Sequence, residues 1–90
     1  MSQPYLEVTY RKGRPLAAYY SLSRRAGQKS HTSRSVESGL VVDFARGGAP
    51  IGIEITAPGV VTLATLNRVL KSLGCAPLTR AEFQPLRAAS

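Results

Sequence analysis

The sequence predicts an α+β fold in which a four-stranded antiparallel β-meander is covered on one face by a C-terminal helix. Four short segments alternate apolar and polar residues with a period of two, which is typical of half-buried strands. A later segment repeats leucine at helical spacing and supplies the cover that one apolar sheet face needs. A chain of 90 residues has room for one modest core, so we expect a single domain over residues 1–90.

Residues 5–10 and 16–23 form the first predicted hairpin, with the apolar side chains of both segments at even-numbered positions. These side chains share a face only if the numbers of directly opposite residues add up to an even number. The connecting loop must then contain an odd number of residues. Lys12-Gly13-Arg14 provides a three-residue loop, in which Gly13 can adopt the positive φ that such loops require.

Residues 39–45 and 50–56 form the second predicted hairpin. Here the apolar positions are even in one segment and odd in the other, so the same argument requires an even loop. The pair Gly47-Gly48 suits a two-residue primed turn. This register predicts that Val42 faces Ile53.

The same register predicts that Phe44 faces Ile51. On the opposite face of the sheet it places Asp43 across from Gly52 and Glu54 across from Val41.

The segment between the two hairpins is polar, serine-rich and basic, and it contains few apolar residues. We interpret residues 24–34 as a mobile basic loop. From about residue 32 the chain is expected to become extended and to lead into the third strand. The consecutive strands then form a meander.

The predicted main helix spans residues 63–73, with Thr62 as its N-cap and Gly74 where helices commonly end. Thr79 and Glu82 have the spacing of a capping box, which indicates a short second helix. The stripe that is expected to cover the sheet consists of Leu63, Leu66, Leu70 and Leu73.

Several classes of protein are disfavoured by composition. No apolar run approaches the ~20 residues of a membrane span, and the first residues lack the pattern of a secretion signal. These two absences, together with a single cysteine that cannot form a disulfide within the chain, indicate a cytoplasmic protein. Cys75 and His31 do not make a zinc site, and a chain of this size has little room for a cofactor-binding cleft, so we expect neither metal nor cofactor. Cys75 is interpreted as a partly buried thiol, and a redox or intermolecular disulfide site is the alternative.

Catalytic groups are sparse in the sequence. Asp43 and Glu54 should be diagonal neighbours on the sheet face away from the helix, a spacing that could suit glycosidic hydrolysis if a groove held the sugar. An open sheet face implies no groove and leaves both carboxylates solvated with ordinary proton affinity. The single histidine, His31, has no acidic residue near it in the sequence to orient it. We therefore expect a protein that is not an enzyme and has no small-molecule substrate.

The formal charge of +7 favours an acidic partner. The candidate nucleic-acid contacts are four basic residues of the expected loop, namely Arg24, Arg25, Lys29 and Arg34. In a meander this loop lies at the opposite end of the sheet from the remaining turn cations, Arg11, Lys12, Arg14 and Arg46. This separation argues against a single basic stripe.

Part of the chain resembles a known family. Val41-Val42-Asp43 and Gly52-Ile53-Glu54-Ile55 resemble the hairpin pattern of the small prokaryotic family catalogued as domain of unknown function 2283, and residues 16–22 resemble its preceding strand. The resemblance covers about two thirds of the chain and implies a prokaryotic protein of this fold with no settled activity. It also implies an interaction role, since some members are suspected antitoxin-like partners of small toxins. The basic first turn departs from the usual acidic turn of the family, and the long basic loop resembles an insertion.

These observations predict a small non-enzymatic module that binds a protein partner or a second copy of itself through its sheet. The candidate interaction face consists of Tyr19, Val41, Asp43 and Glu54, next to sheet edges that can pair with another chain. The alternative is an electrostatic nucleic-acid-binding protein that uses residues 24–34.

Overall fold

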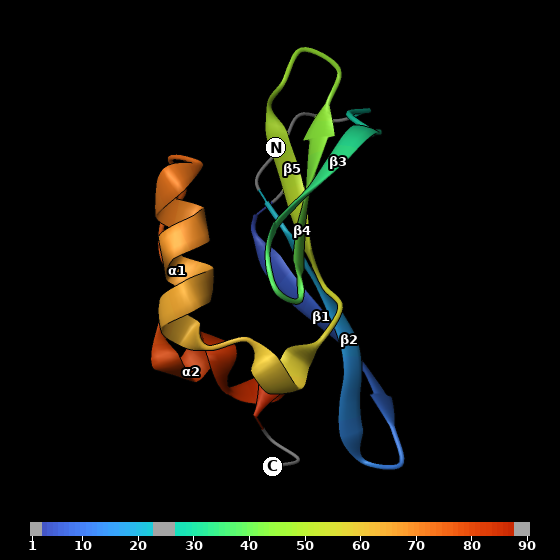
Figure 1. Cartoon of the computed structure of the whole chain (residues 1–90), viewed down its shortest axis with the longest axis vertical. Helices are drawn as coiled ribbons and strands as arrows, with labels where there is room; N and C mark the ends of the chain where they lie inside the picture. The colour runs from blue at the N-terminus through green and yellow to red at the C-terminus, as the bar shows by residue number, and fades with distance from the viewer. Residues whose placement is uncertain (1–2, 23–26, 88–90) are drawn as a thin grey trace.

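The computed structural model describes residues 3–22 and 27–87 and shows a sheet with a layer of helices beside it (Figure 1). The elements follow in the order β1 (Tyr5–Arg11), β2 (Arg14–Ser21), β3 (Ser30–Glu37), β4 (Leu40–Ala45), β5 (Pro50–Ile55), η1 (Pro58–Val60), α1 (Leu63–Ser72), α2 (Arg80–Phe83) and η2 (Gln84–Leu86). The predicted α+β class is confirmed.

The sheet has five antiparallel strands, and the prediction of a four-stranded meander was wrong. The strand order is β1-β2-β5-β4-β3. The segment expected to be a loop contributes the extra strand, because β3 covers Ser30–Glu37 and pairs with β4 along the sheet edge. All eight of its residues are exposed, so the strand needs no apolar face and the alternation rule does not detect it. Because β3 adds one more pass of the chain along the sheet, β4 runs in the opposite direction to the one expected. The strand beside β2 is therefore β5 rather than β4.

The first hairpin has the predicted pairing but a different turn. Leu6 lies opposite Tyr20 and Val8 opposite Ala18, as the even-sum rule requires. The turn contains only Lys12 and Gly13, both with positive φ, so the expected three-residue loop is wrong. Leu16 is the extra residue of a β-bulge in β2, because Thr9 pairs with Ala17 and Tyr10 with Pro15. Because the bulge adds one residue to β2, the numbers of opposite residues beyond it again add up to an even number, as they would not with the shorter turn alone.

In the second hairpin Val42 lies opposite Ile53, as predicted. The register then shifts, and Phe44 pairs with Pro50 rather than with Ile51. Ile51 is the extra residue of this bulge and is almost completely buried. The prediction for Phe44 failed because sequence alternation assumes a regular ladder up to the turn.

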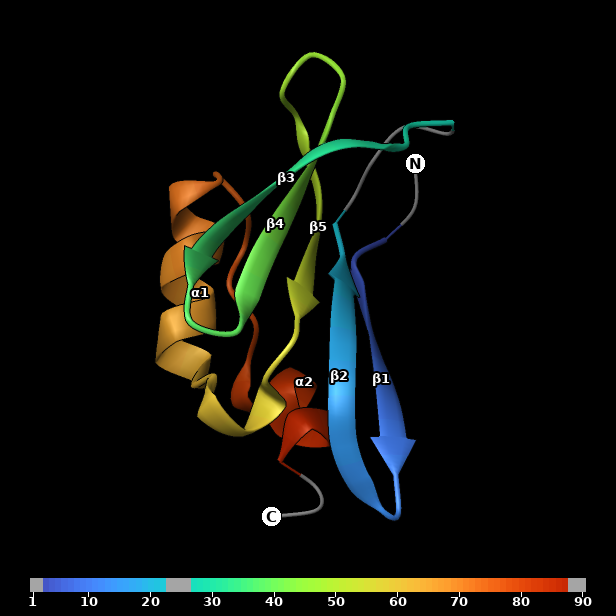
Figure 2. The same cartoon turned by 45° about the vertical axis from the view of Figure 1, so that its right-hand side comes forward.

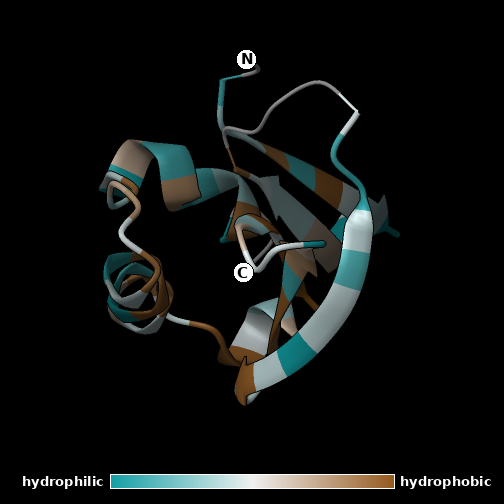
Figure 3. Cartoon of the chain, turned by 90° about the horizontal axis from the view of Figure 1, so that it is seen from above, coloured by the Kyte–Doolittle hydropathy of each residue, from teal (hydrophilic) through white to brown (hydrophobic). Residues whose placement is uncertain are grey.

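The inner face of the sheet, which faces α1, forms the core with the helices. Thr62 caps α1 by accepting a hydrogen bond from the Thr65 amide, and Leu66 and Leu70 are fully buried. Leu63 and Leu73 pack at the border of the core, so the predicted leucine stripe is confirmed. Figure 3 shows hydrophobic bands in both the sheet and the helical layer.

The short second helix is confirmed as well. Thr79 and Glu82 form the predicted capping box at the start of α2. The following turn η2 adds Leu86 to the core, next to the buried Phe83 of α2. These C-terminal residues cover the part of the inner face that α1 does not reach.

The β1–β2 hairpin extends past the helical layer at one end of the molecule, and β1 forms an outer edge of the sheet (Figure 2). Leu16 was expected on the covered face but is 53% exposed, because it lies at the projecting end and in the bulge. Tyr10 is 47% exposed, although its hydroxyl donates a hydrogen bond to the carbonyl oxygen of Pro85 at 2.9 Å.

Candidate functional site

A hydrogen-bonded cluster surrounds Asp43 on the outer face of the sheet, the face turned away from α1. The Tyr19 hydroxyl donates to Asp43 Oδ2 at 3.0 Å, and the Ser33 hydroxyl donates to Oδ1 at 2.6 Å. Asp43 is only 6% exposed as a result. The expectation of a solvated carboxylate was wrong for this residue, because neighbouring strands contribute hydroxyl groups that cover it and replace water.

Tyr19 reaches Asp43 by lying across Gly52. These residues come from three neighbouring strands, with Tyr19 on β2, Gly52 on β5 and Asp43 on β4. A β-carbon added to Gly52 would overlap the Tyr19 ring and hydroxyl oxygen. A side chain at position 52 is therefore incompatible with this position of the tyrosine.

Glu54 lies beside the cluster and opposite Val41, as the predicted register requires. It also lies opposite Tyr19, a pairing that the expected meander did not contain. A side-chain hydrogen bond with Asp43 raises the pKa of Glu54 above its ordinary value, and partial burial and the charge of Asp43 add to the increase. The two carboxyl groups thus interact, and the expected ordinary proton affinity of Glu54 was wrong. Glu54 therefore retains its proton to a higher pH than an isolated glutamate does.

The outer-face candidates Tyr19, Val41, Asp43 and Glu54 are thus brought together on adjacent strands, with Val41 half-buried next to Glu54. Sequence analysis missed Ser33, which holds the second oxygen of Asp43. Its contribution depends on β3, the strand that alternation could not reveal. The cluster mainly fixes three strands relative to one another through a satisfied polar network.

The basic candidates separate in the structure. Arg24 and Arg25 lie outside the described residues. Arg34 belongs to β3, where its guanidinium lies 5.5 Å from the centre of the Phe44 ring on the inner side of the sheet. Lys29 lies at one end of the sheet, where it lines a shallow hollow together with Arg46.

The position of Arg46 corrects the expectation that it would lie at the opposite end from the basic segment. His31 lines the same hollow and is exposed. The extra strand β3 is the reason for the change, because it returns the chain to the other end before β4 begins. Lys29 and Arg46 thus form a small basic group.

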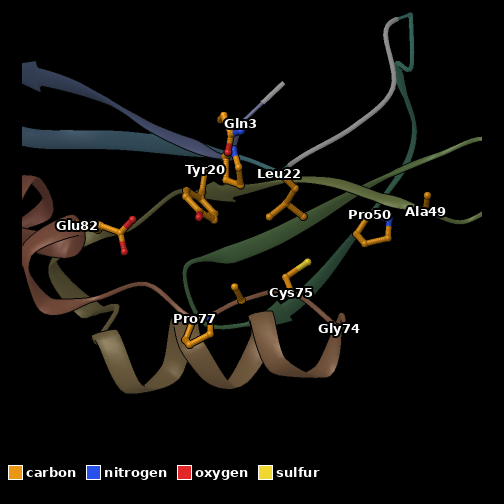
Figure 4. A pocket seen from close by; sticks show the side chains of 11 residues that line it. Gln3, Tyr20, Leu22, Ala49, Pro50, Gly74, Cys75, Pro77 and Glu82 are labelled. Atoms are coloured by element: carbon orange, nitrogen blue, oxygen red, sulfur yellow. The ribbon is translucent and has the colours of Figure 1, made fainter. Parts of the chain in front are cut away.

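A pocket of about 610 Å³ lies between the inner face of the sheet and the segment after α1 (Figure 4). Tyr20 and Leu22 form one wall, Cys75 and Pro77 form the wall across from it, and Glu82 lies at one end. Burial raises the pKa of the Cys75 thiol, which keeps the thiol protonated at neutral pH and makes it a poor nucleophile. This environment agrees with the expected partly buried thiol.

Tyr20 shows a similar effect in this pocket. Burial raises the pKa of its hydroxyl, and the charges of Glu82 and Cys75 contribute less. The phenol therefore stays protonated at neutral pH and can take part in hydrogen bonds. The pocket thus has walls of mixed apolar and polar character.

Metal-ligating residues do not gather in the structure, since no group of three His, Cys, Asp or Glu residues within 3–22 and 27–87 could hold a metal ion. Over the same ranges, no helix has the length and apolar character needed to cross a membrane. Comparison with family models, curated proteins and solved structures gives no significant match to the chain.

Proposed function

We propose that the protein is a non-enzymatic interaction module that self-associates through the edge of its sheet. The supporting observation is the character of β1. This outermost strand is made largely of residues that favour strands and contains neither proline nor glycine. Its inner-face residues Leu6 and Val8 are only partly covered by the core.

The two edges of the sheet differ in how well they are protected against pairing. At β3 two bulges place the extra residues His31 and Val36 in the edge strand itself. Bulges in an edge strand disturb the ladder and discourage another strand from pairing. At β1 the extra residue belongs to β2, so the backbone of β1 remains regular from Tyr5 to Arg11. The regular edge is the one suited to strand addition.

The β1 sequence also favours a second copy as the added strand. An antiparallel pair centred on Val8 places Val8 opposite itself and Leu6 opposite Tyr10, which continues the apolar inner face across the junction. On the outer face the same register pairs Tyr5 with Arg11. It places Glu7 opposite Thr9.

A register centred on Glu7 would oppose like charges and is disfavoured. A pair centred on Val8 includes every residue of β1, because Val8 is the middle residue of Tyr5–Arg11. Tyr5 is 49% exposed and would become covered by the second copy. The outcome would be a continuous sheet of two copies related by a twofold axis.

The outer-face cluster supports this function indirectly. Asp43 and its hydroxyl partners fix β2, β4 and β3 relative to one another, so β1 pairs with a strand that is itself held in place. A rigid edge loses less conformational entropy on pairing than a mobile one.

Molar mass in solution tests the proposal. The unmodified chain should have twice the 9.6 kDa mass of one copy at micromolar concentration. Val8→Lys should be monomeric, because two ammonium groups would meet on the twofold axis. Val36→Lys is the matched control at the other edge, since Val36 is also partly exposed, and this variant should remain dimeric. A monomeric parent, or a dimeric Val8→Lys variant that is folded by circular dichroism, contradicts the proposal.

Cross-linking tests the register separately. Val8→Cys in a Cys75→Ala background should form an intermolecular disulfide, because opposite residues in a strand pair have suitable Cα separation. Val36→Cys in the same background should stay reduced. A disulfide at position 36 alone would place the interface at β3 instead.

The second candidate function is electrostatic nucleic-acid binding through residues 24–34. The observation in its favour is that Lys29 shares a hollow with Arg46, which adds a cation to those expected from the sequence. Its test is salt-dependent binding of DNA or RNA that is lost when Arg24, Arg25, Lys29 and Arg34 are replaced by alanine.

A further inference from the structure

The β1–β2 turn concentrates positive charge at the projecting end of the sheet. Arg11, Lys12 and Arg14, here called the basic tip, are all exposed. No salt bridge among the residues of the described ranges involves these three side chains. The turn extends beyond the helices (Figures 1 and 2), so a large partner can approach it.

The arrangement of the basic tip is unfavourable for the isolated fold. Arg11 and Arg14 are directly opposite each other in the last pair of the hairpin, where like charges repel. Lys12 has φ of 52° and is the only residue other than glycine with positive φ in the described part of the chain. Asn or Gly would suit that turn position better. The residues present therefore disfavour the turn while they concentrate charge for an anionic ligand.

We propose that the basic tip binds the phosphate groups of a nucleic-acid duplex. A two-stranded β-ribbon has the width that the major groove of DNA admits, and the hairpin projects as such a ribbon. Lysine and arginine at its end can contact the phosphates that border the groove. A hollow of about 460 Å³ at the tip is lined by all three cations together with Pro15 and Leu16.

Single-stranded nucleic acid fits the tip less well. Binding of single strands depends on exposed aromatic rings that stack on bases. The nearest ring to the turn along the chain, that of Tyr10, is tied to the C-terminal segment through its hydrogen bond to Pro85. The tip offers charge and ribbon shape without a free stacking platform. This surface is separate from the Lys29 and Arg46 group at the other end of the sheet.

The test compares two charge-matched double variants of the full chain. Lys12→Asn with Arg14→Gln alters the tip without changing β1, and Arg68→Gln with Lys71→Gln alters two exposed cations of α1, outside both basic groups. Removing two cations from a formal charge of +7 leaves +5 in both variants. Binding is measured as fluorescence anisotropy of a labelled random-sequence DNA duplex over a series of salt concentrations.

The tip variant should bind the duplex about tenfold or more weakly, and its salt slope should fall by about two, one for each lost phosphate contact. The control variant should bind within about twofold of the parent. The melting temperature of the tip variant should equal or exceed that of the parent, because Asn suits the left-handed turn position and one like-charge contact is removed. This second readout separates loss of binding from loss of folding.

Three outcomes overturn the proposal. The tip variant could bind the duplex as well as the parent does, or the control variant could lose as much affinity as the tip variant. The parent could also fail to bind the duplex at low salt while binding phosphatidylserine vesicles, which would assign the tip to an anionic membrane surface. Because neither double variant alters the edge residues of β1, the result does not depend on self-association.

Discussion

The Tyr19 hydroxyl donates a hydrogen bond to the carboxylate of Asp43 across the backbone of Gly52, so that one tyrosine on β2 covers β5 and reaches β4. Asp43 is thereby buried on a sheet face that carries no helix. The contact depends on the absence of a side chain at position 52. It explains why a glycine occupies the interior of a central strand, where glycine usually weakens the sheet.

Gly52→Ala should destabilise the protein by about 1–2 kcal/mol, because the added methyl group displaces Tyr19 and breaks its hydrogen bond to Asp43. Urea unfolding measures the change. In a Tyr19→Ala background the same substitution should change the free energy of unfolding by less than about 0.5 kcal/mol, since no ring remains to be displaced. Equal effects in the two backgrounds would show that Tyr19 does not account for the requirement for glycine.

Glu54 should make stability depend on pH. Its pKa in the folded state lies above the ordinary value of 4.5, mainly because of its hydrogen bond with Asp43, so the folded protein holds this proton more tightly than the unfolded chain does. Its contribution to stability is therefore present below about pH 4.5 and is lost as the pH rises through the raised pKa. Glu54→Gln removes this dependence and keeps a hydrogen-bonding group beside Asp43.

Glu54→Gln should accordingly be more stable than the parent at neutral pH, and the difference should shrink toward pH 4.5. Urea unfolding at several pH values provides the measurement. Glu7→Gln is the control, because it removes a carboxylate from the outer face at a position paired with Tyr19 rather than next to Asp43. A variant whose stability relative to the parent does not change with pH would contradict the coupling of the two carboxyl groups.

Asn67 should be important for the position of the C-terminal segment. Its side-chain amide donates to the Leu78 carbonyl oxygen at 3.0 Å, and its side-chain oxygen accepts from the Leu78 amide at 2.8 Å. Asn67→Ala leaves both backbone groups of Leu78 without these partners and should lower the free energy of unfolding by about 1–3 kcal/mol. Chemical denaturation checks the value.

Ser72→Ala is a suitable control on the same helix, because the Ser72 hydroxyl donates to the carbonyl oxygen of Val69 within α1 itself. Its loss should change stability by less than about 0.5 kcal/mol. Similar losses for the two variants would mean that the link to Leu78 has no special importance.

The sequence by itself determined the parts of the fold in which a repeating pattern meets a buried surface. The leucine spacing predicted α1, and Thr79 with Glu82 predicted the start of α2, since capping depends on neighbours only three residues apart. Alternation likewise placed Val42 opposite Ile53. In each case a local rule and the requirement to bury apolar groups point to the same arrangement.

The tertiary structure alone decided what depends on contacts between distant segments. β3 has no apolar face and forms because β4 provides a ladder of backbone hydrogen bonds, so its sequence gives little sign of a strand. This extra strand reversed the chain and placed Arg46 near Lys29. It also brought Ser33 to Asp43.

Asp43 and Glu54 were identified from alternation as neighbours, but their environment was not. The exposure of a carboxylate depends on which side chains lie over it, and here those come from β2 and β3. Bulges at Leu16 and Ile51 likewise follow from how two strands and their turn fit together. The apolar periodicity of the sequence predicts which side chains are buried. Which strands pair, and which polar groups lose contact with water, depends on how the whole sheet packs.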